Sequence, residues 1–85
     1  MFKVLKRDGS LQDFDWKKIT KGVTEAGGTT EEAEQVAREV ETWLTQAAVD
    51  GVIKSYDLHV KVTEILKMVN VTAGKLFEEY KKPEK

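Results

Sequence analysis

The sequence contains no cysteine, only one histidine and only one proline. The absence of cysteine excludes disulfides, thiolate metal sites, iron–sulfur ligation and cysteine catalysis. A single histidine also cannot form a histidine-based metal cluster. No stretch approaches the roughly 20 apolar residues that a membrane span requires, and the first residues carry no apolar signal-peptide core. We therefore expect a cytoplasmic protein that does not associate with membranes.

Charge is unevenly distributed along the 85 residues. The net charge is −1, which argues against direct nucleic-acid binding, because such domains carry a clear basic excess. Residues 1–21 nevertheless hold six lysines and arginines against three acidic residues, while the remainder holds eight against twelve. A chain of this length forms one compact core. We expect one domain with a locally basic first quarter and an acidic body.

The first 28 residues predict a β-hairpin followed by a helix. Two short strands at residues 2–6 and 11–14 flank Asp8-Gly9, a dipeptide typical of a type I′ turn. Asp15 is placed as an N-cap, and Gly27-Gly28 ends the helix. Between them the apolar residues share one helical face: Trp16, Ile19, Val23 and Ala26.

The next segment predicts the longest helix. Thr29 and Glu32 have the spacing of a capping box, and an apolar stripe runs from Ala33 to Ala47. Asp50-Gly51 terminates this helix. Trp43 lies in register with the stripe, as Trp16 does in the helix before it, so both tryptophans are expected to be core or half-buried residues.

The last third predicts a short strand and two more helices. The strand covers residues 52–54, and Ser55 is placed to cap a helix whose apolar positions continue to Val69. Asn70 to Thr72 breaks that helix, and a final one is expected from about Thr72 to Lys82, before Pro83. The fold class is therefore α+β, a four-helix bundle capped by a small three-stranded β-sheet lid.

The sequence offers no convincing catalytic group. Ser55 and His59 lie one helical turn apart, but no nucleophile motif surrounds the serine, which favours a helix cap beside a surface histidine. The glutamates between 31 and 41 lack the spacing of a calcium loop and fit a solvated helix face. We expect a protein that is not an enzyme and has no metal site of its own.

Phosphate binding needs only cations and free backbone N–H groups, and two places supply them. One is Lys6-Arg7 at the hairpin turn, and the other is Lys54-Ser55 with His59 at the start of the third helix. From composition alone, Lys6-Arg7 is more often a solvated turn than a ligand site. There is no P-loop and no G-x-G-x-x-G turn, so a bound nucleotide is expected to be sensed rather than consumed.

The motifs resemble those of a known family. Val4-Leu5-Lys6-Arg7-Asp8-Gly9 followed by Phe14-Asp15-Trp16-Lys17-Lys18-Ile19 is similar to the V-x-K-R-D-G and F-D-x-x-K-I signature of ATP-cone domains. Residues 53–59 and the terminal helix at 73–82 resemble later parts of the same family. The resemblance spans essentially the whole chain and implies an ATP-cone domain at residues 1–82 with a flexible tail at 83–85.

ATP-cones are regulatory modules of ribonucleotide reductases and of a transcriptional repressor of those enzymes, and they bind ATP or dATP. The resemblance implies that Lys6 and Arg7 contact phosphates while the Val4 backbone and Ile19 bracket the adenine. Further implied contacts are Gln12 and Asp15 at the base edge, Lys18 near base or phosphates, Ser55 at phosphate oxygens, His59 near ribose or phosphates, and Lys54 and Lys82 on the positive rim.

The chain departs from the family pattern at Gln12, where an acidic residue is common, and at Ser55, where threonine is usual. It also lacks the four zinc-binding cysteines of the repressor, so we expect that it is not a complete repressor of that type. The leading hypothesis is an ATP- or dATP-binding domain, with Mg²⁺ accompanying the nucleotide, that controls ribonucleotide reductase in cis or in trans. The alternative is an ATP-cone that has lost nucleotide binding and acts as a protein–protein interaction module. A homo-oligomer is compatible with either.

Overall fold

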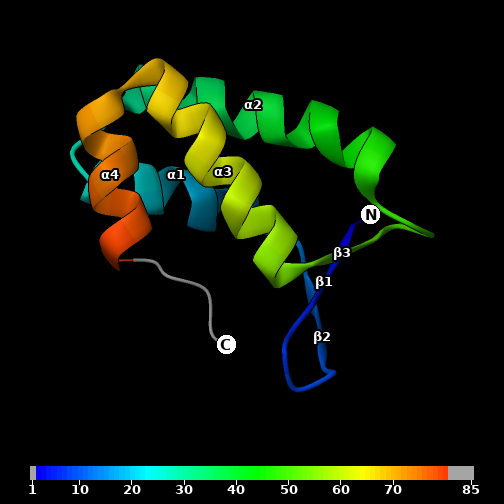
Figure 1. The fold of residues 1–85 in the computed structure, drawn as a ribbon. Coiled ribbons are helices and arrows are strands. Elements are labelled where there is room, and N and C mark those ends of the chain that lie inside the picture. Colours follow the sequence, from blue (N-terminus) through cyan, green and yellow to red (C-terminus); the bar gives the residue numbers. More distant parts are fainter. Residues whose placement is uncertain (1, 81–85) are drawn as a thin grey trace.

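The computed structural model describes residues 2–80, so the predicted tail and the candidate residue Lys82 lie outside the described part. It contains four helices and a three-stranded sheet, which confirms the predicted α+β class (Figure 1). The elements are β1 (Lys3–Leu5), β2 (Leu11–Asp13), α1 (Trp16–Glu25), α2 (Thr30–Ala47), β3 (Val52–Lys54), α3 (Ser55–Val69) and α4 (Val71–Tyr80). None of these helices is long and apolar enough to cross a membrane.

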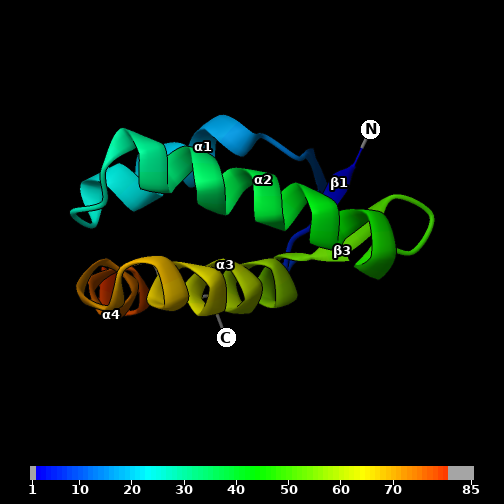
Figure 2. The same ribbon diagram turned by 90° about the horizontal axis from the view of Figure 1, so that it is seen from above.

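The four helices form two layers. Seen from above, α1 and α2 make one layer and α3 and α4 the other (Figure 2). Helix pairs α1–α2, α2–α3 and α3–α4 pack most extensively. The core between them contains Leu44, Leu66, Val23, Val36, Val40 and Val62, all fully buried. Trp43 packs against this core as predicted, whereas Trp16 is 49% exposed and is not part of it.

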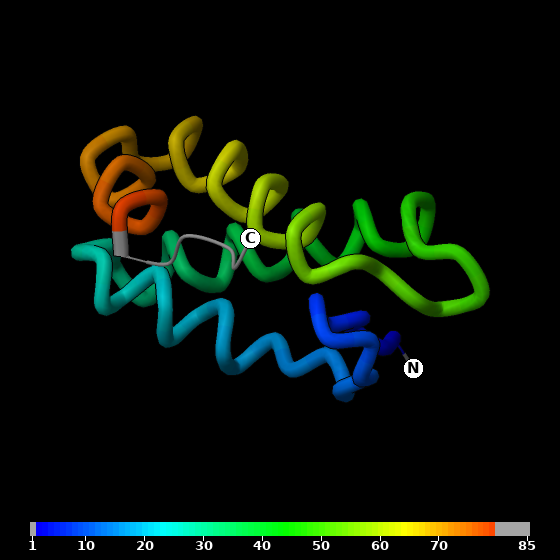
Figure 3. The backbone as a smooth tube through the Cα atoms, turned by 60° about the horizontal axis from the view of Figure 1, so that its bottom comes forward, coloured from blue at the N-terminus to red at the C-terminus, as the bar shows by residue number. Residues whose placement is uncertain are grey.

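The sheet joins the first residues of the chain to its middle. Its order is β2-β1-β3, with β1 antiparallel to β2 and parallel to β3. The hairpin therefore lies at the end of the bundle where α3 begins (Figure 3). Val4 and Ile53 are paired neighbours on the inner face and are both buried in the core.

The type I′ turn occurs at a different Asp-Gly pair from the one predicted. Asp50 and Gly51 have φ values of 53° and 78°, and Val49 and Val52 exchange two backbone hydrogen bonds of 2.9 Å around them. Two positive φ values in a two-residue loop define type I′. The prediction for Asp8-Gly9 is wrong, because among the described residues Asp50 alone has a positive φ without being glycine.

The first hairpin instead uses a three-residue loop. The Gly9 N–H donates to the Lys6 carbonyl over 3.0 Å, and Gly9 has a φ of 90°. This is a four-residue turn from Lys6 to Gly9 whose last residue is a left-handed glycine. Asp8 stabilises the loop by accepting hydrogen bonds from the Ser10 N–H and hydroxyl at 2.9 and 2.6 Å.

The predicted N-caps of the first two helices are confirmed. Asp15 accepts from the Lys17 N–H over 2.9 Å, and Thr29 and Glu32 form the reciprocal capping box. The predicted break after Val69 is confirmed, but it is shorter than predicted, because Asn70 alone separates α3 from α4 and Thr72 is already helical. Asn70 also has two contacts that the sequence pattern did not indicate. Its Oδ1 accepts from the Ala73 N–H over 3.1 Å, and its Nδ2 donates to Glu32 Oε1 over 3.1 Å. The start of α2 is thereby tied to the α3–α4 junction.

Gly74 permits the close approach of α4 to α3. A Cβ at this position would lie 2.8 Å from both the Cα and the backbone N of Lys67. Glycine to alanine in a helix normally stabilises by roughly 0.5–1 kcal/mol. We predict that Gly74→Ala instead lowers the free energy of unfolding by about 1–3 kcal/mol, because backbone atoms cannot move aside as a side chain can.

Urea unfolding monitored by circular dichroism measures this change. The neighbouring exposed position provides the control, since Lys75→Ala should alter stability by no more than about 0.5 kcal/mol. A Gly74→Ala protein as stable as the wild type would show that the two helices are not held at this separation.

Candidate functional site

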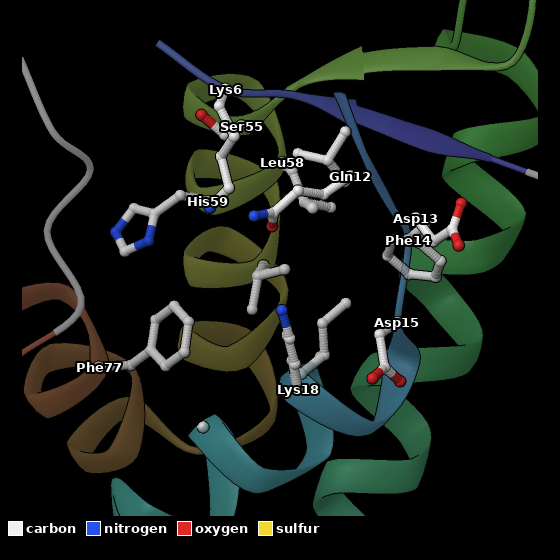
Figure 4. A pocket seen from close by; sticks show the side chains of 14 residues that line it. Lys6, Gln12, Asp13, Phe14, Asp15, Lys18, Ser55, Leu58, His59 and Phe77 are labelled. Atoms are coloured by element: carbon white, nitrogen blue, oxygen red, sulfur yellow. The ribbon is translucent and has the colours of Figure 1, made fainter. Parts of the chain in front are cut away.

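A cavity of about 330 Å³ lies between the sheet and the helices (Figure 4). Its volume is at the lower end of the range for small-molecule sites. Residues from β1, β2, α1, α3 and α4 line it: Val4, Lys6, Gln12, Asp13, Phe14, Asp15, Lys18, Ile19, Gly22, Ser55, Leu58, His59, Val62 and Phe77. The hairpin, the second half of the chain and the last helix thus all contribute to one site.

The end of the cavity nearest the sheet favours an anion. Lys6 and Ser55 line this end (Figure 4). The prediction that Ser55 caps α3 is wrong, because Ser55 is the first helical residue and no side chain caps the helix at Lys54. The first N–H groups of α3 therefore keep their hydrogen-bonding capacity, and the helix dipole adds positive potential there.

An apolar wall runs from Leu58, near the sheet end, to Phe77 at the far end of the cavity (Figure 4). Leu58 and Val62 of α3, Ile19 of α1 and Phe77 of α4 provide it. Gly22 lets Phe77 approach α1, because a Cβ on Gly22 would lie 3.0 Å from Phe77 Cε1. A planar apolar group would find aliphatic and aromatic contacts here, with the anion-favouring end nearby.

Two polar side chains extend into the space between these ends. The Gln12 carboxamide comes from β2 and the Lys18 ammonium from α1, and they point toward each other (Figure 4). Neither side chain forms a hydrogen bond or ion pair with any other residue in the 2–80 range. Both are therefore available to a ligand.

The acidic residues of the cavity are partly occupied. Asp13 is in an ion pair with Lys3, which lowers its pKa. Asp15 uses one carboxylate oxygen to cap α1. Asp13 and Asp15 therefore neutralise less of the positive charge of Lys6 and Lys18 than the number of carboxylates in the cavity would indicate.

His59 closes one side of the cavity. Its ring stacks on Phe77 with a centroid distance of 5.2 Å and an interplanar angle of 20°. Burial lowers the pKa of the imidazole, and the charge of Glu78 offsets part of that shift. The lowered pKa favours the neutral imidazole, which donates a hydrogen bond from one ring nitrogen and accepts one at the other.

Eight of the predicted site residues line this one cavity: Val4, Lys6, Gln12, Asp15, Lys18, Ile19, Ser55 and His59. Arg7 and Lys54 do not line it and are exposed, and Lys82 lies outside the described residues. Sequence reasoning missed six lining residues: Asp13, Phe14, Gly22, Leu58, Val62 and Phe77. Leu58 and Val62 had a usable signal, since each lies three residues after a predicted site residue on the same helix face.

The described residues contain no group of three histidine, aspartate or glutamate side chains placed to hold a metal ion. Fold and cavity together define a small α+β ligand-binding domain with an anion-attracting end and an apolar wall.

Comparison with protein families identifies the domain. The model for the ATP cone domain matches residues 2–83, nearly the whole chain, so the chain belongs to the ATP-cone family. Membership of this family makes it a nucleotide-binding regulatory domain. No curated protein matches the sequence.

The lowered pKa of His59 leads to a prediction about how stability depends on pH. Its pKa in the folded state is below the value of about 6.5 expected for the unfolded chain, so the unfolded state binds more protons between the two values. Stability should be fully present above about pH 6.5 and should fall as the pH drops through the folded-state pKa. NMR titration of the imidazole, which belongs to the sole histidine, measures that pKa directly.

Thermal melts at pH 7.5, 6.5 and 5.5 measure the loss of stability. In a His59→Gln variant this part of the pH dependence should disappear. An NMR pKa at or above the value of a short histidine peptide would contradict the burial of the ring.

Proposed function

We propose that this domain binds ATP or dATP in the cavity between the hairpin and the helices, and thereby regulates a ribonucleotide reductase in cis or in trans. One observation carries the proposal: a single cavity contains two lysines, Lys6 and Lys18, the uncapped start of α3 and an apolar wall. Membership of the ATP-cone family supports an adenine nucleotide as the ligand.

The phosphates are assigned to the sheet end of the cavity. Lys6 and Ser55 provide a cation and a hydroxyl there, and the α3 N-terminus provides backbone donors. Charge-assisted hydrogen bonds of this kind are about twice as strong as neutral ones. Arg7 is adjacent to Lys6 in the exposed turn, and we assign it a phosphate contact that requires the hairpin tip to move toward the ligand.

The base is assigned to the apolar wall, bracketed by Val4 and Ile19. Gln12 lies beside that wall with a free carboxamide, which both donates and accepts hydrogen bonds at a base edge. Asp15 retains one carboxylate oxygen for the exocyclic amine of adenine. His59 is then left for the ribose or the phosphates.

Mg²⁺ fits this assignment only as part of the nucleotide. Asp13 and Asp15 are the carboxylates of the cavity, and each has a partner already. Because Mg²⁺ commonly binds phosphates while keeping several waters, the ion would arrive with the triphosphate. Lys6 and Lys18 would neutralise the remaining phosphate charge.

The alternative, a cone that has lost its ligand and acts only through protein contacts, is less well supported. In a domain that had lost nucleotide binding, we would expect substitutions that remove the cations or fill the cavity. Lys6, Lys18 and Ser55 are instead all present around an open volume.

Thermal melts test ligand binding. With Mg²⁺ present, ATP or dATP at 100 times the dissociation constant should add about 2.7 kcal/mol of stability, and GTP at the same concentration should add less. No shift with either adenine nucleotide would reject the proposed ligand and favour the interaction-module alternative.

Two adjacent lysines of α1 provide a matched test of the site. Both lysines are exposed, but Lys18 lines the cavity and Lys17 does not. Lys18→Ala should weaken ATP binding roughly 10- to 100-fold, as expected for loss of a charged hydrogen bond of about 1.5–3 kcal/mol. Lys17→Ala should leave the affinity within about twofold, because an exposed charge outside the site is largely screened.

Isothermal titration calorimetry measures both affinities. Equal effects of the two substitutions would indicate that ATP binds through general positive charge rather than in the cavity.

A further inference from the structure

The sheet has a second face, turned away from the buried side chains of Val4 and Ile53. The strand register places Lys3, Leu5, Leu11, Val52 and Lys54 on this outer face, opposite the inward-facing Val4 and Ile53. Asp13, the last residue of β2, is paired with Lys3 on this face and also borders the cavity. Val49 extends the face, because it is paired with Val52 across the type I′ turn. None of these outer-face residues is buried.

Apolar side chains run across this outer face. Leu5 and Leu11 are direct cross-strand partners, and Val52 and Val49 are paired at the other edge. Leu11 is 56% exposed and Val49 is 74% exposed. The solvated face of a sheet normally carries polar residues, so an apolar band on a sheet this small indicates a surface that another molecule covers.

The outer face is directly connected to the cavity through the same strands. Val4 and Gln12 contribute to the cavity from the inner face of β1 and β2, and their neighbours Leu5 and Leu11 lie on the outer face. Each strand is only three residues long. A ligand that changes the position of the hairpin therefore also changes the outer face.

The charges on the outer face restrict what can bind it. Lys3 is neutralised by Asp13. Lys54 lies beside Leu5 in the register, and no ion pair joins it to any residue between 2 and 80. A complementary surface would be apolar with a carboxylate opposite Lys54.

We propose that the outer face of the sheet is where the domain docks on the protein it regulates, through an apolar patch of that protein that carries an acidic side chain. This inference rests on the proposed function, in which the partner is a ribonucleotide reductase. Binding of nucleotide on the inner face adjusts the docking of the partner on the outer face.

The test compares two double variants with closely matched exposure. Leu11→Glu with Val49→Glu places two negative charges on the outer face. Met68→Glu with Val71→Glu changes two apolar residues that are 86% and 58% exposed at the α3–α4 junction. All four positions are exposed, so each double variant should fold, and melting curves without ligand verify this.

Each protein is first melted with and without ATP and Mg²⁺, then mixed with purified ribonucleotide reductase. Complex formation is measured by sedimentation velocity, and turnover by reductase assay. We expect all three proteins to show the same ATP shift. The outer-face variant should bind the reductase at least tenfold more weakly, while the junction variant should match the wild type.

The outcomes separate the two proposals. No ATP shift in the wild type rejects the proposed nucleotide site, whatever the reductase does. A normal ATP shift with equal reductase binding by both variants overturns the outer face as the docking surface. A wild type that binds ATP but does not bind the reductase overturns the partner. If that wild type self-associates and the outer-face variant does not, the face belongs to a second copy of the chain.

Discussion

The parallel pairing of β1 with β3 is the contact on which the site depends. It joins Lys3, Val4 and Leu5 to residues 52–54, immediately before α3 begins. The Lys3 N–H donates to the Gly51 carbonyl over 2.7 Å, which connects this ladder to the type I′ turn. Without the pairing, Lys6 and Gln12 would have no fixed relation to Ser55 and His59. The cavity exists because a long-range contact of three residues positions a hairpin over a helix N-terminus.

Much of the fold could be predicted because its signals are local. Asp15 and the Thr29–Glu32 box start their helices through contacts within four residues, and those contacts formed as expected. The turn type was mispredicted because the sequence has two Asp-Gly pairs and propensity does not distinguish them. The contacts on either side of each pair determine the turn type. Val49 and Val52 pair across two residues, whereas in the first hairpin Asp8 binds Ser10.

The site was partly predictable for a different reason. Charged and hydroxyl residues such as Lys6, Lys18 and Ser55 stand out from an acidic chain, and the family motifs give them a role. Phe77 and Val62 carry no such signal, because an apolar residue at helical spacing is the same whether it faces the core or a ligand. The participation of Phe77 also depends on Gly22, which lies far away in the sequence and allows α4 to approach α1.

The uncapped start of α3 explains why ligand binding should be felt beyond the cavity. The first N–H groups of a helix are costly to leave without partners, and among residues 2–79 no side chain satisfies them. An anion that binds them stabilises the β3–α3 junction itself rather than a side chain on an otherwise rigid element. That junction includes Lys54, whose side chain is on the outer face of the sheet. A ligand can shift a conformational equilibrium only by as much as it favours one state over another, and this junction is where bound and free states would differ most in hydrogen bonding. Under the proposed function, the outer face of the sheet would consequently be the surface most directly linked to occupancy of the site.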